Sequence, residues 1–328
     1  MPARPLTRRS FAASALGLLA GCGGPRIELG GMRKRGEPIT WHRAALESET
    51  GLGPIDQIAA GDRWAYGPEG FEPLPVAVPG DWLWSQHEEP QGVGGFLLGA
   101  PTRAEPPRTT IILVALGELD GLVPGTDTLR DYLERFFGLP VEIAEPLSLP
   151  SEQLDAREHG GHRQLRAGRI LDELEPRLPE HAYCMLAVTR DDLYPGPGWN
   201  FVFGQARLHA RVGVQSLLRY DPAFEGRTDA PAGIARRRGL AVVSHEVGHM
   251  FGISHCVHHR CVMNGFNNLL ELDRTPMHLC RVCLRKLQLV VPGLDLVARY
   301  ERLREHYLRD AMLVEAAWVQ ARLAARVG

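Results

Sequence analysis

The sequence lacks an excess of charge of either sign. Its 328 residues include 37 lysines and arginines against 39 aspartates and glutamates, so the formal net charge is −2. Without a basic excess, the composition gives no sign of nucleic-acid binding, and without an acidic run it gives no sign of a solvating tail. Hydrophobic residues make up 44% of the chain, which is ordinary for a soluble globular protein. We therefore expect no nucleic-acid partner, and either one large domain with appendages or two small domains.

The apolar run near the N-terminus is too short to cross a bilayer as a helix. This run, Phe11–Ala20, follows Arg8 and Arg9, an order typical of an export signal of the twin-arginine type. At its end, Leu19–Cys22 reads LAGC, which resembles a bacterial lipobox whose cysteine, here Cys22, carries lipid. We expect residues 1–21 to be the signal and lipidated Cys22 to hold the protein at a membrane of the bacterial cell envelope. An accidental basic and apolar start of a cytosolic protein is the alternative.

Glycine-rich phosphate-binding fingerprints are absent after the predicted strands, which argues against a nucleotide-binding fold. The strands are indicated by apolar runs at Thr109–Leu116, Val141–Ala144 and Tyr183–Thr189. Apolar residues at helical spacing predict intervening helices at Asp127–Phe137 and Arg163–Leu174. This alternation predicts parallel neighbouring strands joined by right-handed crossovers.

The second half of the chain continues with a further strand at Val212–Leu218 and a helix at Pro231–Phe251. We expect Arg236–Arg238, near the start of that helix, to form a solvated face. Apolar residues at helical spacing from Leu296 onward predict one or two C-terminal helices that pack on the domain.

One segment carries the expected chemistry, the motif HExxHxxGxxH from His245 to His255. His245 and His249 are four residues apart, so on a helix they point from the same face. Gly252 lets the helix end and the chain turn back, because glycine adopts positive φ without a Cβ clash. Three imidazoles and one open position describe a catalytic zinc, at which a water becomes a nucleophile near neutral pH. Glu246 stands beside that metal as the general base. A surface helix with two solvated histidines is the alternative.

The chain has only six cysteines, and four of them follow the histidine motif in two pairs with metal-ligand spacing: Cys256, Cys261, Cys280 and Cys283. These four predict a second zinc site, closed and structural. Cys184 lies in an apolar run and is expected to be a buried, inert thiol. Because Cys22 is expected to carry lipid, no pair remains for a disulfide.

The full pattern reads HExxHxxGxxHC, then CxM, then CxxC, and in this pattern the chain resembles the archaemetzincins (archaelysins), a family of metzincin zinc metallopeptidases. Three further segments are similar to the eukaryotic-type members of that family: Pro79–Gln91, Thr189–Ala206 and Glu271–Gln288. The resemblance covers roughly Pro79 to Tyr300, and the first part of the chain departs from the family.

The resemblance implies an α/β (α+β) fold of the metzincin-like zincin type. Such a domain has a twisted mixed sheet with an antiparallel edge strand over the cleft, an active-site helix, a four-cysteine zinc subsite and C-terminal helices. By resemblance Asn200–Ala206 is the edge strand, and an unpaired edge can accept an extended peptide, although an ordinary edge strand would look the same. Met263 would lie in a turn beneath the metal, where its role is packing. The family implies aminopeptidase as well as endopeptidase activity.

These observations divide the chain into four parts. Residues 1–21 are the export signal, 22–108 a tether and an N-terminal arm rich in proline, glycine and tryptophan, 109–292 the archaemetzincin catalytic domain, and 293–328 a C-terminal helical tail. The arm contains four of the six tryptophans, whereas a disordered tether would have few aromatic residues. We expect the arm to be irregular and packed on the catalytic domain, and whether it blocks the cleft is open.

Two classes of function fit the sequence. The first is a monomeric zinc metallopeptidase that hydrolyses peptide bonds of peptide or protein substrates, using two zinc ions, one catalytic and one structural. The second is a non-catalytic, zinc-stabilised envelope lipoprotein that binds peptides or a protein partner. Glu246 favours the enzyme, because a binding module does not need the base.

Several other polar residues are weaker candidates. Tyr194 is a candidate donor to the transition-state oxyanion. An aminopeptidase also needs an acidic group for the substrate's N-terminus, and the candidates Asp191, Asp192 and Glu271 cannot be ranked from the sequence. His258, His259 and His278 are expected to be solvated loop histidines.

Overall fold

The structure is a computed structural model that describes residues 51–226 and 233–326. The expected export signal, Cys22 and the predicted helix start at Pro231 lie outside the described residues. Among the helices within these ranges, none is both long and apolar enough to cross a membrane.

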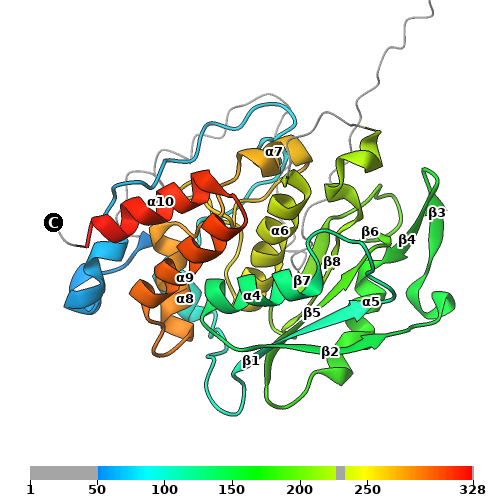
Figure 1. The fold of residues 1–328 in the computed structure, drawn as a ribbon, viewed down its shortest axis with the longest axis horizontal. Coiled ribbons are helices and arrows are strands. Elements are labelled where there is room, and N and C mark those ends of the chain that lie inside the picture. Colours follow the sequence, from blue (N-terminus) through cyan, green and yellow to red (C-terminus); the bar gives the residue numbers. More distant parts are fainter. Residues whose placement is uncertain (1–50, 227–232, 327–328) are drawn as a thin grey trace, which may run out of the picture.

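Five strands form the main sheet in the order β2-β1-β5-β8-β7 (Figure 1). In chain order they are β1 (Thr110–Leu116), β2 (Val141–Leu147), β5 (Ala182–Thr189), β7 (Gly204–Arg207) and β8 (Val212–Ser216). The first three strands and β8 are parallel, whereas β7 pairs antiparallel with β8 at one edge. Every residue of β5 and β8 is buried, as expected for apolar strands covered on both faces. The predicted mixed sheet with an antiparallel edge strand is confirmed.

Helices cover both faces of this sheet. Consecutive side chains of a strand point to opposite faces, and accordingly Ile111 and Ile112 of β1 belong to different hydrophobic clusters. On the side of Ile112 the cluster is filled by α5 (Ala167–Leu174). On the side of Ile111 it is filled by α4 (Thr126–Phe137) and by α6 (Ile234–Met250), the helix that carries the histidine motif.

A second, smaller sheet was not predicted. It has the order β3-β4-β6 and consists of β3 (Arg157–His159), β4 (His162–Arg166) and β6 (Asp192–Tyr194). The helix predicted over Arg163–Leu174 is therefore wrong in its first turn, because β4 pairs with β6 and the helix begins only at Ala167. Gln164 explains the strand, since its buried amide donates to Asp192 Oδ2 (2.6 Å).

The segment after the histidine motif is mostly helical. Its helices are α7 (Leu269–Arg274), α8 (Arg281–Val290), α9 (Leu296–Arg309) and α10 (Leu313–Ala324). The C-terminal helices are confirmed, while α7 and α8 were not predicted. α9 packs along α4, where Asp131 accepts hydrogen bonds from His306 Nδ1 (2.8 Å) and Arg309 (2.7 Å).

The expectation of a solvated face at Arg236–Arg238 is wrong for two of the three arginines. Arg238 is 3% exposed and forms a two-point ion pair with Asp273 of α7 (2.8 and 2.7 Å). Arg237 donates to Glu315 of α10 (2.8 Å). A guanidinium presents several donors in one plane, which allows these arginines to join α6 to two later helices.

The described part of the N-terminal arm is irregular and packs on the rest of the molecule. It contains α2 (Trp82–Ser85), α3 (Val93–Leu98) and two short 3-10 helices, Ile55–Gln57 and Ala60–Tyr66. Side chains of this arm, such as that of Phe96, belong to the same hydrophobic cluster as α6 and α9.

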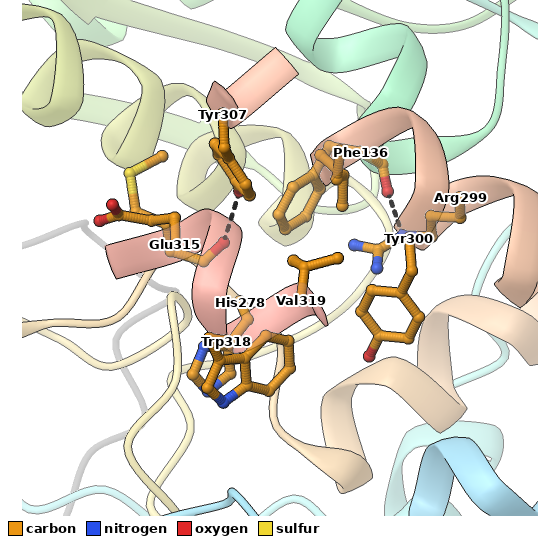
Figure 2. A pocket seen from close by; sticks show the side chains of 10 residues that line it. Phe136, His278, Arg299, Tyr300, Tyr307, Glu315, Trp318 and Val319 are labelled. Carbon is orange, nitrogen blue, oxygen red and sulfur yellow. Dashed lines mark hydrogen bonds between the residues drawn. The ribbon is translucent and has the colours of Figure 1, made fainter. Parts of the chain in front are cut away.

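A small cavity of about 20 Å³ lies between α9 and α10. Figure 2 shows Arg299 and Tyr300 of α9, Trp318 and Val319 of α10, and Phe136 of α4 around it. This volume suffices for about one water molecule. None of the three motif histidines lines it, so the cavity is separate from the site described next.

Candidate metal centre

The end of α6 positions the three motif histidines. His245 and His249 lie on the helix, which ends at Met250. Gly252 follows with φ +81°, and the amide of Ile253 donates back to Gly248 O (3.3 Å). This left-handed residue reverses the chain, as predicted for a glycine at this position, and brings His255 back toward the helix.

The three imidazoles converge, and one ring nitrogen from each lies within 4.8 Å of the others. His245 Nδ1 donates to Val262 O (2.9 Å), and His249 Nδ1 donates to Ile253 O (2.8 Å). A carbonyl oxygen can only accept, so in both neutral rings the proton is on Nδ1 and Nε2 carries a lone pair. Burial lowers the pKa of His249 to about 3 and the pKa of His245 well below its usual value, which keeps both rings neutral.

The two Nε2 atoms of His245 and His249 are only 2.9 Å apart. Two lone pairs directed at each other at this distance repel unless a cation lies between them. His255 Nε2 is also buried, and within the described ranges it has no hydrogen-bond partner. Three imidazole nitrogens converging on one point fit zinc, for which such nitrogens are ordinary ligands.

The third histidine is oriented by a residue that the sequence analysis missed. His255 Nδ1 lies 2.7 Å from Glu88 Oε1, which also accepts a hydrogen bond from the indole Nε1 of Trp82 (2.8 Å). Glu88 and Trp82 belong to the N-terminal arm, and 167 residues separate Glu88 from His255. The only available signal was that both lie in Pro79–Gln91, one of the segments that resemble the family.

Glu246 lies on α6 between His245 and His249 and is fully buried. Its side chain packs against Gly204 of β7, where an added Cβ would lie 2.7 Å from Glu246 Oε1. The predicted edge strand Asn200–Ala206 is shorter in the structure and starts at Gly204. The edge of the sheet thus passes directly over the residue predicted to be the base.

Met263 packs beneath the histidines. A Cβ added to Gly248, the residue of α6 directly before His249, would lie 2.4 Å from Met263 Sδ. Met263 is 0% exposed, and its carbonyl accepts from the amide of Cys256 (2.7 Å). This geometry agrees with a packing role.

The four cysteine sulfurs after the motif form a second cluster within 4.8 Å of one another: Cys256, Cys261, Cys280 and Cys283. All four are at most 2% exposed and none is in a disulfide. Cys261 Sγ accepts from the amides of Cys280 (3.2 Å) and Met263 (3.5 Å). A closed set of four sulfurs with amide donors around them fits a structural zinc. Cys184, in contrast, is an isolated buried thiol in β5, and burial raises its pKa.

The four weaker candidates are bonded to other groups. The Tyr194 hydroxyl donates to Asp155 O (2.6 Å), and Asp191 pairs with Arg163 (2.6 Å). Asp192 is fully buried and pairs with Arg219 (2.7 and 2.6 Å). Glu271 accepts from the backbone amides of Trp82 (2.9 and 3.0 Å) and Asn267 (2.8 Å). The structure therefore favours neither Tyr194 as the oxyanion donor nor any of the three acidic residues as the group that binds the substrate's N-terminus.

The expectation of solvated histidines in this region is wrong for His258 and His278, whereas His259 is partly buried. His258 is 4% exposed and packs against Gly51, at which a Cβ would lie 2.7 Å from the imidazole. His278 stacks on Trp318 with ring centroids 3.6 Å apart, and burial lowers its pKa to about 3. Folding of the arm and of α10 over these loops buries rings that the local sequence gave no reason to bury.

Comparison with known proteins places this chain in a family. Residues 180–289 match the model of peptidase family M54. Archaemetzincin-2 of Mus musculus is 35% identical over 265 residues, which cover 71% of this chain and 74% of that protein, and archaemetzincin-2 of Homo sapiens is 32% identical, covering 71% and 73%. Among solved structures, archaemetzincin from Methanopyrus kandleri is 31% identical, with a TM-score of 0.46, and covers 56% of this chain and 96% of that chain.

Proposed function

This chain belongs to the archaemetzincins, peptidase family M54, and is a zinc-dependent metallopeptidase; from this premise we propose that His245, His249 and His255 hold the catalytic zinc. The observation that carries the proposal is the pair of Nε2 lone pairs facing each other at 2.9 Å, with both Nδ1 atoms held by carbonyls. When bound, zinc supplies a Lewis acid that polarises a carbonyl and lowers the pKa of water to about 7.

Glu246 is the general base in this proposal. Its carboxylate takes the proton of the attacking water and then delivers a proton to the leaving amine. The contact between Glu246 and Gly204 supports the assignment, because it sets the carboxylate beside the edge strand. A substrate that adds to β7 as an extended strand would place its backbone next to this carboxylate.

The four cysteines are proposed to hold a second, structural zinc, which gives two zinc ions per chain. Its support is the closed and buried sulfur cluster. We further infer that the enzyme is a monomer and that it is exported by a twin-arginine-type signal and attached to the bacterial cell envelope through lipidated Cys22. The order of the arginine pair, the apolar run and LAGC supports this location. The alternative of a non-catalytic lipoprotein is not favoured, since the family consists of peptidases and Glu246 is present.

A random peptide pool tests this function. Purified protein is incubated with the pool, with and without a zinc chelator, and products are identified by mass spectrometry. We expect cleavage that the chelator abolishes and added zinc restores. Release of N-terminal residues alone would make the enzyme an aminopeptidase, and internal cleavage an endopeptidase. Metal analysis should give two zinc ions per chain. The second site would be refuted by one zinc together with four cysteines free to a thiol reagent.

A further inference from the structure

The three histidines are not held in the same way. His245 and His249 have their Nδ1 atoms on backbone carbonyls, at Val262 and Ile253. His255 has no such carbonyl and instead meets the carboxylate of Glu88 at 2.7 Å. The arm thus supplies one of the three groups that orient the metal-binding rings.

We propose that Glu88 is a positioning residue that holds His255 for zinc, so that the N-terminal arm completes the metal centre. This inference rests on the proposed function, since it takes the three histidines as zinc ligands. Glu88 Oε1 accepts the Nδ1 proton of His255, which leaves the lone pair of Nε2 directed at the metal. The negative charge of the carboxylate also makes the imidazole a stronger ligand than a neutral acceptor would.

Glu88 is itself held in place. Its Oε1 accepts from Trp82 Nε1 (2.8 Å), and the Trp82 ring meets the His255 ring edge to face, with centroids 5.1 Å apart. The Trp82 ring lies against Gly265, where a Cβ would be only 2.4 Å from it. The backbone amide of Trp82 donates hydrogen bonds to both carboxylate oxygens of Glu271. Glu271 therefore has a role in fastening the arm to α7, beside the histidine cluster.

A second contact from the same segment fixes the loop that leads to His255. The Gln91 amide donates to Gly252 O (3.1 Å) and accepts from the amide of Ser254 (3.1 Å). Gln91 Oε1 also accepts from Lys286 Nζ of α8 (2.9 Å), a lysine that is 1% exposed. The arm thus binds both the backbone before His255 and its side chain, which restricts the imidazole to one orientation.

Three variants of the otherwise complete protein test this inference: Glu88→Ala, Glu88→Gln and, as a matched control, Glu89→Gln. Glutamine keeps an oxygen that can accept from His255 and Trp82 but removes the charge. The neighbouring Glu89 has a side chain that is 77% exposed and pairs with His87. Zinc affinity is measured by competition with a chelator, while a thiol reagent reports separately whether the cysteine cluster keeps its metal.

We expect Glu88→Ala to bind the histidine-site zinc about 10–100-fold more weakly, Glu88→Gln to lie between it and wild type, and Glu89→Gln to match wild type. Excess zinc should restore activity to Glu88→Ala, which a merely misfolded protein would not allow. Wild-type affinity in a folded Glu88→Ala protein would overturn the inference. If that variant does not fold, wild-type affinity in Glu88→Gln overturns it equally.

A failure of the proposed function would look different. In that case wild-type protein would hold no zinc that a His245→Ala, His249→Ala double variant loses. If wild-type protein does hold such a zinc and the Glu88 variants hold it as tightly, only the role of Glu88 is wrong.

Discussion

The carboxylate of Glu246 is buried beside the imidazoles that are proposed to bind zinc. It is 0% exposed and lies on α6 between two imidazoles whose Nε2 atoms point to one place. A carboxylate buried in this way is costly unless charge or hydrogen bonds compensate it, and a zinc ion at the histidines would supply that charge. A zinc ion at the histidines would therefore favour both the burial of Glu246 and the chemistry proposed for it.

The substitution Glu246→Gln should leave zinc bound and abolish hydrolysis. Glutamine has nearly the same shape but cannot take a proton from water, and the loss of a general base typically costs about 10²–10⁴-fold in rate. Turnover and zinc content are measured together, with Glu301→Gln on the exposed face of α9 as the control. Turnover near the wild-type value with zinc retained would remove Glu246 from the mechanism.

Gly204 offers a test of the contact between the edge strand and the base. In Gly204→Ala the new Cβ would lie within 2.9 Å of three atoms of the Glu246 side chain, so the carboxylate or β7 must move. A displacement near 1 Å of a catalytic group can cost about 10²-fold in rate, and we expect a fall of that order in kcat with the protein still folded. Gly196→Ala is the control, because nothing lies within 4 Å of the Cβ there. Equal kcat in both variants would contradict the contact.

Among single residues, those placed by local sequence spacing could be predicted, whereas those placed by long-range contacts could not. The convergence of His245, His249 and His255 follows from one helix and one glycine turn, and both lie within eleven consecutive residues. Glu88 could not be found in this way, because the contact with His255 spans 167 residues and exists only after the arm has packed. The same limit applies to Arg238, whose partner Asp273 is 35 residues away.

Among the elements, the loop from His255 to Met263 joins the two candidate metal sites. Its first residues are a histidine of one cluster, His255, and a cysteine of the other, Cys256. The carbonyl that holds His245 Nδ1 belongs to Val262, which follows Cys261 directly. Two of the three histidines therefore depend on the backbone that the cysteine cluster fixes.

From this we predict that Cys280→Ser weakens zinc binding at the histidines and lowers thermal stability together. Cys280 Sγ lies 3.6 Å from Cys256 Sγ, so losing this sulfur as a zinc ligand loosens the start of the loop at Cys256. Loss of such support usually costs about 10–100-fold in metal affinity. Chelator competition and thermal unfolding are followed separately.

The control for this coupling is Cys184→Ser, which also alters a fully buried thiol but in β5, outside both clusters. We expect it to lower stability without changing zinc affinity at the histidines. If Cys280→Ser loses the structural zinc while keeping wild-type affinity at the histidines, the two sites are independent.

The elements themselves were predictable where one helix or strand buries a continuous apolar face. β1, β5 and α4 appear close to their predicted bounds, because their apolar spacing reflects the core that they enter. β4 was predicted as helix because its pairing with β6 is not visible in local spacing. The small sheet containing β4 and β6 forms only when these two strands, which are distant in sequence, pair in the folded protein.

For the whole molecule, the arm, the central part and the tail share one hydrophobic core. Residues as far apart as Leu52, Leu113 and Val319 belong to the same cluster. The tail also holds the arm directly, since Trp318 Nε1 donates to Gly70 O (2.9 Å) and Arg322 donates to Trp64 O (2.8 Å). The boundaries at 108 and 292 thus separate segments of sequence that fold together. Composition predicted the character of the arm, and it could not predict that the arm reaches the metal centre.

The remaining question at this scale is where the enzyme works, and Cys22→Ala tests it. A lipid on Cys22 would hold the protein at a membrane, since each buried CH₂ of an acyl chain contributes about 0.8 kcal/mol. Removing the thiol removes the attachment point and leaves the twin-arginine pair intact. We therefore expect the variant to leave the membrane fraction and to appear soluble in the envelope compartment.

Replacing Arg8 and Arg9 by lysine should instead retain the protein inside the cell, which separates the signal from the anchor. Membrane association unchanged in Cys22→Ala would mean that some other part of the chain attaches it.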